Sequence, residues 1–450
     1  MSDAAASDVR PVGVAVLGMG TVGTEVIRYM TEHSDELTAR IGGSLALRGV
    51  AVRDTARDRG IDPALLTADA ASLVTRDDVD VVVELMGGID VPRPLLLEAL
   101  RAGKSVVTAN KALLAEYTDE LAEAADSSRS DLYFEAAVAG AIPVIGPLRR
   151  SLAGDQIQRV VGIVNGTTNY ILSEMESTGA DYAETLAEAG RLGYAEADPT
   201  ADVEGYDAAA KAAILASIAF HTRVTAADVY REGISRITAD DIESARDMDC
   251  TIKLLAICEK IARPEGGQAV SARVYPALLP TSHPLAAVNG AFNAVVVEAE
   301  AAGRLMFYGQ GAGGAPTASA VLGDLVAAAR NKVHRGRAPG ESTYAALPVA
   351  TMDEVSTRYH VRLRVADRPG VLAQVAAEFS NHGVSIAQVR QTEVEVPEGA
   401  EDVEEPTAEL TVLTHLASER ALADTVAALA DQEAVTAVTS VIRLEGVDTE

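Results

Sequence analysis

Residues 12–23 read VGVAVLGMGTVG, and this stretch decides the fold of the first part of the chain. The apolar run 12–17 is typical of a buried parallel strand. It leads directly into the G-x-G-x-x-G spacing of Gly18, Gly20 and Gly23, which in this context is typical of dinucleotide-binding folds. Gly18 allows the tight turn, Gly20 lets a pyrophosphate approach the backbone, and Gly23 lets the next helix pack closely. We therefore expect a dinucleotide at the N-terminus of a helix that begins at Thr21.

The segments after the glycine turn alternate between strands and helices. We expect strands at 45–52, 79–88, 104–110 and 131–140, and helices at 94–103 and 111–128. This alternation predicts an α/β chain that opens with a Rossmann-type, doubly wound parallel sheet. At the end of the second strand an acidic residue selects NAD, whereas an arginine accommodates the phosphate of NADP. Arg53 therefore favours NADP as the cofactor, and the neighbouring Asp54 keeps NAD open.

The pattern of predicted helices and strands changes from about residue 155. After a strand that ends near residue 163, we expect alanine-rich helices as far as about residue 260. Antiparallel strands are expected over 265–280 and 291–309, and a helix over 315–331. Residues 334–348 have the composition of a linker. From residue 357 the predicted order is β-α-β-β-α-β, which is the ferredoxin-like pattern.

The composition and charge of the chain exclude several classes of function. The 450 residues carry a formal net charge of −28, which repels nucleic acid. No apolar run reaches the roughly 18 residues of a membrane span, and the polar N-terminus is unlike a signal peptide. Cys250 and Cys258 are too few for a disulfide framework. We therefore expect a cytoplasmic protein with a small-molecule substrate and no nucleic-acid or membrane partner.

The stretch 193–219, GYAEADPTADVEGYDAAAKAAILASIA, places five carboxylates ahead of a single lysine. Asp207 and Lys211 share one helical face because they are four residues apart. An exposed ion pair would be the ordinary interpretation, but residues 208–220 leave no polar face to solvate it. We therefore expect a buried pair in the wall of an active site. Lys211 can protonate a developing alkoxide and hold positive charge near it, as reduction of a carbonyl by hydride requires.

Other polar residues complete this candidate site. Lys111 follows the strand 104–110 at its carboxyl end, where open α/β sheets bind ligands, although an ordinary first-turn helix residue would look the same. Glu196 and Asp202 suit an ammonium group. The helix that opens with NGTTN at 165–169 presents free N–H groups for a carboxylate. Receptors for both charges beside a nicotinamide indicate an amino-acid substrate.

Together these motifs resemble the homoserine dehydrogenase family. The resemblance rests on VLGMGTVG, TANKALLA, FEAAVAGAIPVI, GIVNGTTNYIL, YGQGAGGAPTASAVLGDL and the stretch 193–219. The segment VADRPGVLAQVAAEFSNHGVSI resembles an ACT domain, and we expect the monofunctional arrangement of the family. The resemblance implies an NAD(P)-dependent, reversible reduction of L-aspartate 4-semialdehyde to L-homoserine, in the biosynthesis of threonine, methionine and isoleucine.

The resemblance also implies roles for single residues. Lys211 would exchange the proton, with Lys111 and Asp207 as catalytic neighbours. The substrate would be bound by Glu196, Asp202 and Thr167. The cofactor would be bound by Gly18, Gly20, Thr21, Val22, Gly23, Arg53, Lys111, Gly311 and Gly313.

Two further sites and an assembly come from the resemblance alone. A monovalent cation, sodium, would be caged by the backbone carbonyls of Glu135, Val138, Gly140 and Ile142, although the residues themselves predict only a buried strand. An amino-acid effector, threonine, would bind the turn of Asp367, Arg368, Pro369 and Gly370, which by itself is an ordinary β-turn. The chain would form a homo-oligomer, a dimer or a tetramer.

The expected domains follow from the motifs and the resemblance. A dinucleotide-binding domain covers 1–150, with 310–333 returning to it, and a substrate-binding and dimerisation domain of α+β type covers 151–333. A linker covers 334–356, and a ferredoxin-like ACT domain covers 357–450.

Two other functions stay open. Another NAD(P)-dependent dehydrogenase of amino or hydroxy acids would use the same cofactor half but would not need Glu196, Asp202, Asp207 and Lys211 in that order. A catalytically dead amino-acid-sensing regulator would bind cofactor and threonine without turnover.

Overall fold

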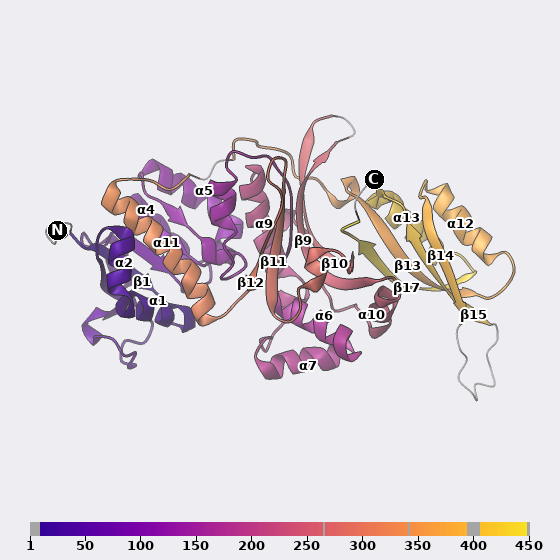
Figure 1. The fold of residues 1–450 in the computed structure, drawn as a ribbon, viewed down its shortest axis with the longest axis horizontal. Helices are drawn as coiled ribbons and strands as arrows, with labels where there is room; N and C mark the ends of the chain where they lie inside the picture. The colour runs from indigo at the N-terminus through magenta and orange to yellow at the C-terminus, as the bar shows by residue number, and fades with distance from the viewer. Residues whose placement is uncertain (1–9, 264–265, 341–342, 394–405, 448–450) are drawn as a thin grey trace.

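The chain is described from a computed structural model, which covers residues 10–263, 266–340, 343–393 and 406–447. Three parts follow one another along the longest axis of the molecule (Figure 1). The first sheet lies at one end, the second sheet crosses the middle, and the C-terminal α/β unit lies at the other end. The N-terminal residues 1–9, which we expect not to be a signal peptide, lie outside the described residues. Within the described ranges, no helix is both long enough and apolar enough to cross a bilayer.

The first sheet has six strands in the order β3-β2-β1-β4-β5-β6, and all of its ladders are parallel. Its strands are β1 (Val12–Leu17), β2 (Leu45–Ala51), β3 (Leu66–Thr67), β4 (Val81–Glu84), β5 (Ser105–Thr108) and β6 (Leu132–Tyr133). Every residue of β1 is buried, as expected for a parallel strand covered on both faces. The order confirms the doubly wound topology that the glycine turn predicts.

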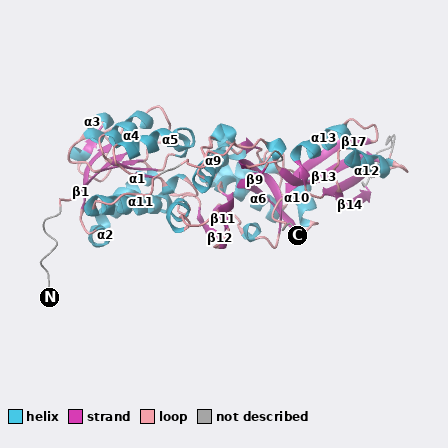
Figure 2. Ribbon diagram, turned by 90° about the horizontal axis from the view of Figure 1, so that it is seen from above, coloured by secondary structure: helices cyan, strands magenta, loops and turns pink. Residues whose placement is uncertain are grey.

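Helices cover both faces of this sheet (Figure 2). One face carries α3 (Ala70–Thr75), α4 (Pro92–Arg101) and α5 (Lys111–Ser127), and the other carries α1 (Thr21–Glu32), α2 (Ser34–Ile41) and α11 (Gly314–His334). Although α11 lies far along the sequence, its residues Ala318, Val321 and Leu325 join the same apolar core as Val14 and Val16 of β1. The glycine turn ahead of α11 is thereby brought to the first sheet.

The strand predicted over 131–140 is wrong beyond Tyr133. β6 ends there, residues 135–137 form a single 3₁₀ turn, and Ala139 and Gly140 adopt left-handed backbone with φ of 57° and 61°. The chain turns because the carboxylate of Glu135 folds back to accept the backbone N–H groups of Val144, Ile145 and Gly146. The apolar composition that indicated a strand reflects a buried loop instead.

The second sheet has 11 strands, and its main path runs β12-β11-β7-β9-β10-β17-β13-β15-β14. Its middle part contains β7 (Ile157–Ile163), β8 (Tyr230–Arg231), β9 (Cys250–Ala262), β10 (Gln268–Pro280), β11 (Phe292–Ala299) and β12 (Gly303–Gln310). The helices of this part are α6 (Gly166–Thr178), α7 (Tyr182–Leu192), α8 (Thr200–Val203), α9 (Tyr206–Phe220) and α10 (Ala239–Arg246). The antiparallel strands predicted over 265–280 and 291–309 are confirmed.

The prediction of helices as far as residue 260 is wrong at its end. Residues 250–262 form β9, which pairs with β10 over its whole length, and the first nine of them are all buried. A strand buried on both faces loses the alternation of apolar and polar residues. Its sequence therefore resembles that of a buried helix.

The C-terminal part has the predicted order β-α-β-β-α-β. Its elements are β13 (Ser356–Ala366), α12 (Val371–Asn381), β14 (Ile386–Glu393), β15 (Thr407–Thr414), α13 (Glu419–Ala430) and β17 (Val435–Leu444), with the short β16 (Ala417–Ser418) beside β13. β17 pairs in parallel with β10 through Arg443 opposite Ala277 and Leu444 opposite Leu278. This part therefore extends the second sheet.

Charged side chains are buried where β10 meets β17. The side chain of Arg273 is 2% exposed, and its Nη2 lies 2.7 Å from Glu259 and 3.7 Å from Glu445. Glu445 also pairs with Arg159 and accepts a hydrogen bond from the hydroxyl of Tyr275 at 2.6 Å. Burial would raise the pKa of Glu445, but Arg159 and Arg273 hold that pKa below its ordinary value. These groups depend on one another for their charges.

Candidate active site

The glycine turn has the shape that a dinucleotide needs. Gly18 has a φ of 100°, and a Cβ atom there would lie 2.8 Å from a backbone carbonyl oxygen that follows β4. A Cβ atom at Gly23 would lie 2.2 Å from the carbonyl oxygen of Gly18, so close packing of α1 requires glycine. Gly20 precedes α1 and faces open space. The first turn of α1, with Thr21 and Val22, is therefore open to an anionic group.

The turn ahead of α11 lies against this cradle. A Cβ atom at Gly314 would lie 2.9 Å from Cγ2 of Thr21. Gly311 is half-buried and Gly313 is exposed, so their backbone borders the same space. The structure thus brings the two predicted glycine turns together, as a dinucleotide that touches both would require.

Arg53 and Asp54 are both exposed just beyond the end of β2. Asp54 Oδ1 accepts the backbone N–H of Ala56 at 3.0 Å, so this carboxylate is engaged in its own turn. The position agrees with the place where doubly wound folds bind the ribose next to adenine.

A carboxylate held between two lysines forms the centre of the site. Asp207 and Lys211 lie one turn apart in α9. Lys211 Nζ lies 2.6 Å from Asp207 Oδ2, and it donates a hydrogen bond to the carbonyl oxygen of Val164 at 2.6 Å. Lys111, the first residue of α5, pairs with the other oxygen of Asp207. The expected buried pair is present, and a second lysine shares its carboxylate.

Burial and charge set the protonation of this centre. Asp207 is 7% exposed and Lys211 is 8% exposed, whereas the side chain of Lys111 is 47% exposed. Burial would raise the pKa of Asp207, but attraction to Lys211 and Lys111 outweighs it and holds that pKa well below its ordinary value. Burial lowers the pKa of Lys211, and Asp207 opposes this effect. Asp207 therefore stays ionised, while Lys211 releases a proton more readily than an exposed lysine does.

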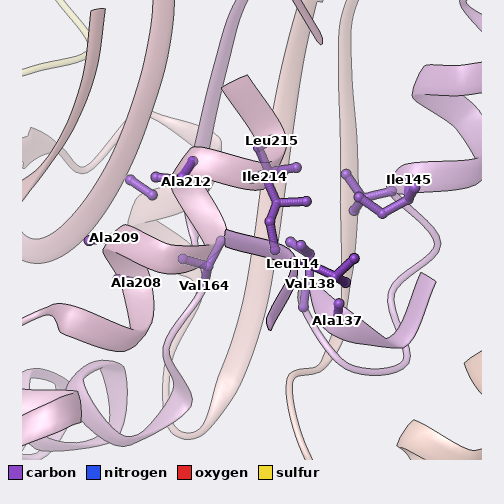
Figure 3. Close-up of a cluster of buried hydrophobic side chains, with 14 of the residues drawn as sticks. Leu114, Ala137, Val138, Ile145, Val164, Ala208, Ala209, Ala212, Ile214 and Leu215 are labelled. Atoms are coloured by element: carbon purple, nitrogen blue, oxygen red, sulfur yellow. The ribbon is translucent and has the colours of Figure 1, made fainter. Parts of the chain in front are cut away.

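Apolar side chains pack against the helix that carries Asp207 and Lys211 (Figure 3). Ala212 and Leu215 of α9 lie in one buried cluster with Leu114 of α5, Val164 after β7 and Val138. Such surroundings exclude water and strengthen the charge interactions beside them.

Asn165 links the acids, and the sequence did not single it out. Its Nδ2 donates to Asp202 Oδ1 at 2.7 Å and to Asp207 Oδ2 at 2.9 Å. Its Oδ1 accepts the backbone N–H of Thr168 and caps α6. The expectation of free N–H groups here is therefore wrong at Thr168. An asparagine just before a helix is a signal for this cap, but no local signal points to the two distant carboxylates.

The other predicted substrate residues lie around this centre. Asp202 is half-buried beside Asn165. The hydroxyl of Thr167 donates to the carbonyl oxygen of Tyr194 at 2.7 Å, which ties α6 to the turn after α7. Glu196 is exposed in that turn. The structure therefore joins Asp202 to the lysine pair and leaves Glu196 at the rim.

The loop predicted to cage a cation is buried. Glu135, Val138 and Ile142 are 9%, 0% and 2% exposed. Within the described ranges, backbone N–H groups donate to none of the carbonyl oxygens of Val138, Gly140 and Ile142. The described residues contain no group of three or more His, Cys, Asp or Glu that could hold a metal ion. A cation here would depend on backbone oxygens, which are donors that suit hard ions.

The predicted effector turn lies far from the lysine pair, in the C-terminal part. All four residues, Asp367 to Gly370, are exposed between β13 and α12. Gly370 precedes α12 with a φ of 96°, and Asp367 Oδ1 accepts a hydrogen bond from the side-chain amide of Gln391 at 3.2 Å.

A dinucleotide cradle beside a buried lysine–carboxylate pair defines an NAD(P)-dependent oxidoreductase that acts on a hydroxyl group. Residues 18–135 match the family model for the NAD binding domain of homoserine dehydrogenase, residues 143–326 match that for homoserine dehydrogenase, and residues 359–434 match that for the ACT domain. The chain belongs to the homoserine dehydrogenase family and carries an ACT domain.

Individual relatives agree over the whole length. The chain is 67% identical over 439 residues to the homoserine dehydrogenase of Mycobacterium tuberculosis, covering 98% of this chain and 99% of that protein. It is 66% identical over 435 residues to that of Corynebacterium glutamicum, covering 96% of each.

Solved structures show the same architecture. The crystal structure of a homoserine dehydrogenase from Thiobacillus denitrificans superposes with a TM-score of 0.89 and 38% identity, covering 97% of this chain and 98% of that chain. A hyperthermophilic archaeal homoserine dehydrogenase in complex with NADPH gives a TM-score of 0.60 and 28% identity, covering 71% of this chain and 98% of that chain.

Proposed function

We propose that the chain reduces L-aspartate 4-semialdehyde to L-homoserine reversibly, with Lys211 as the proton donor and acceptor. The observation that carries this proposal is the surroundings of the Lys211 ammonium group. A lysine has three N–H donors, and two of them are directed to Asp207 and to the carbonyl of Val164. The third is left for the oxygen of the substrate, beside the buried apolar side chains of α9.

Each group has a distinct part in the reaction. The bound nicotinamide supplies or accepts the hydride. Lys211 hydrogen-bonds the carbonyl oxygen, stabilises the charge that develops on it and delivers the proton, which its lowered pKa favours. Asp207 stays ionised and orients Lys211, while Lys111 holds a second positive charge against the same carboxylate.

The acidic side chains near the pair suit the amino group of the substrate. Asp202 is held by Asn165 next to Asp207. Glu196 is exposed in the turn after α7, and Thr167 ties that turn to α6. We assign Glu196, Asp202 and Thr167 to substrate binding on this basis.

The cofactor is NADP in this proposal. Arg53 lies exposed at the end of β2, where a cation accommodates the additional phosphate. The archaeal homoserine dehydrogenase that resembles this chain was solved with NADPH.

Regulation and assembly are further parts of the proposal. Threonine binds the exposed turn 367–370 of the ACT domain and lowers activity, and a second subunit completes that site. The chain works in the cytoplasm as a dimer or a tetramer. The carbonyl oxygens of Glu135, Val138, Gly140 and Ile142 hold a sodium ion, which the lack of backbone donors to the last three supports.

Substitution of Lys211 by methionine tests the central assignment. We expect Lys211→Met to reduce turnover with homoserine by about 1,000-fold, the middle of the range for a general acid or base, while calorimetry shows unchanged cofactor affinity. Turnover is followed by nicotinamide absorbance with homoserine and, separately, with malate. Retained turnover would remove Lys211 from the mechanism. Binding of cofactor and threonine by the wild type without turnover would instead identify a sensing protein.

A further inference from the structure

Asn293, in β11, has a buried side chain without hydrogen bonds. The residue is 1% exposed, and neither Nδ2 nor Oδ1 has a hydrogen-bond partner among the described residues. Nearly all buried amides in native proteins are paired, so an amide that lacks both partners calls for a physical reason. Asn169 differs from Asn293 in its Nδ2, which donates to the backbone carbonyls of Val288, Gly290 and Phe292, although its Oδ1 has no partner among the described residues.

Gly311 packs against this amide. A Cβ atom at Gly311 would lie 2.3 Å from both Cγ and Nδ2 of Asn293, so the amide packs directly against the backbone of Gly311. The next two residues of the turn, Ala312 and Gly313, are exposed. Since Gly314 lies against Thr21, this turn runs from the pyrophosphate cradle to Asn293.

The other neighbour of Asn293 is the catalytic centre. β11 and β7 are antiparallel, with Ala294 opposite Ile163. One step along this register places Asn293 beside Val164, whose carbonyl oxygen accepts the hydrogen bond of Lys211 at 2.6 Å. Asn293 therefore lies at the end of the cofactor path where the nicotinamide must meet the substrate oxygen.

We propose that Asn293 binds the carboxamide of the nicotinamide. A side-chain amide has one acceptor and one pair of donors, and the nicotinamide carboxamide has the same set, so the two groups can exchange two hydrogen bonds. The turn 311–314 shifts off the amide when the cofactor binds, which the lack of side chains at three of its four positions allows. The unpaired amide of the free chain is thus kept for the cofactor. The inference holds for NAD and NADP alike, because the carboxamide is common to both.

Two changes, one in the protein and one in the cofactor, test this contact. Asn293→Leu removes the amide at nearly constant volume, and 3-acetylpyridine adenine dinucleotide phosphate lacks the carboxamide N–H donors. Calorimetry measures the affinity of both proteins for NADP and for this analogue, or for the NAD pair if NAD binds more tightly. We expect each change alone to weaken binding about tenfold, as for the loss of one to two hydrogen bonds. The two changes together should weaken it little further.

The binding of the analogue to the Asn293→Leu variant decides whether the contact exists. If the analogue binds more weakly than NADP by the same factor in Asn293→Leu as in the wild type, Asn293 does not touch the carboxamide. Unchanged NADP affinity in Asn293→Leu would overturn the proposal as well. The variant should unfold at the same temperature as the wild type or higher, because it removes an unpaired buried amide. If the leucine variant does not fold, Asn293→Ala takes its place in the same comparison. Asn169→Leu, which breaks structural bonds only, should lower the unfolding temperature without changing the discrimination between the cofactors.

These outcomes are independent of the proposed reaction. Turnover of homoserine by the wild type tests the function, whereas the difference between NADP and its analogue tests Asn293 even in a chain without turnover.

Discussion

Asp207→Asn removes the charge that holds the proton of Lys211, and its effect should depend on pH. The substitution keeps the shape of the side chain and an acceptor oxygen, but it removes the negative charge that contacts the buried ammonium. An opposite charge in direct contact shifts a pKa by about one to three units. Loss of a negative charge in contact at 2.6 Å lowers the pKa of Lys211 further, and removal of one partner of a buried ion pair costs about 3 kcal/mol.

The size of the effect differs between the two directions of the reaction. Reduction requires the protonated amine, so the alkaline limb of its pH profile should move towards acid. Above both pKa values, reduction should be about 100-fold slower than in the wild type. Oxidation of homoserine requires the neutral amine, so the acid limb of the pH profile for oxidation should also move towards acid. The loss of rate in this direction should be smaller.

The assay is the pH dependence of kcat/KM in both directions, followed by nicotinamide absorbance. Asp198→Asn is a matched control, because Asp198 is exposed and its hydrogen bonds within the described residues are to Thr200. It should leave both limbs in place. A loss in Asp207→Asn that is equal at every pH would show that Asp207 does not act through the proton of Lys211.

Three further changes test the cofactor preference and two buried charges. Arg53→Ala should weaken binding of NADPH more than of NADH, and equal losses in a fluorescence titration would show that Arg53 does not contact the phosphate. Glu445→Ala leaves the two guanidinium groups of Arg159 and Arg273 with one shared carboxylate, Glu259, in place of two, and it should lower the free energy of unfolding in urea by about 3 kcal/mol; an unchanged value would contradict the dependence of these groups on one another. Burial lowers the pKa of Lys253 to about 8, so the unfolded chain binds more protons and stability should rise by about 3 kcal/mol from pH 8 to about 10.4. Lys253→Met should abolish this rise in stability. If the rise persists in the variant, other titrating groups cause it.

Features determined by neighbouring residues could be predicted from the sequence. The glycine turn, the order of strands and helices in the first sheet and the β-α-β-β-α-β pattern depend on local spacing. The pair of Asp207 and Lys211 could be predicted for the same reason, because both residues lie one turn apart on one apolar helix. Lys111 was placed near them only because carboxyl ends of parallel strands meet at one edge.

Features set by distant contacts could not be predicted. β9 is a strand because β10 lies beside it, and its own composition fits a helix equally well. The loop 135–142 leaves the sheet because Glu135 reaches N–H groups about ten residues away. Asn165 and Asn293 acquire their significance from strand register and from segments far along the chain.

The ladder between β10 and β17 has a practical consequence for shortened versions of this chain. Removal of residues 357–450 would uncover the end of β10, a row of backbone donors and acceptors ready to pair with another molecule. It would also remove Glu445 and leave the guanidinium of Arg273 with Glu259 as its remaining acidic partner. A truncated enzyme made for crystallisation would therefore tend to aggregate. It would need a lysine or proline at that edge, and an uncharged residue in place of Arg273.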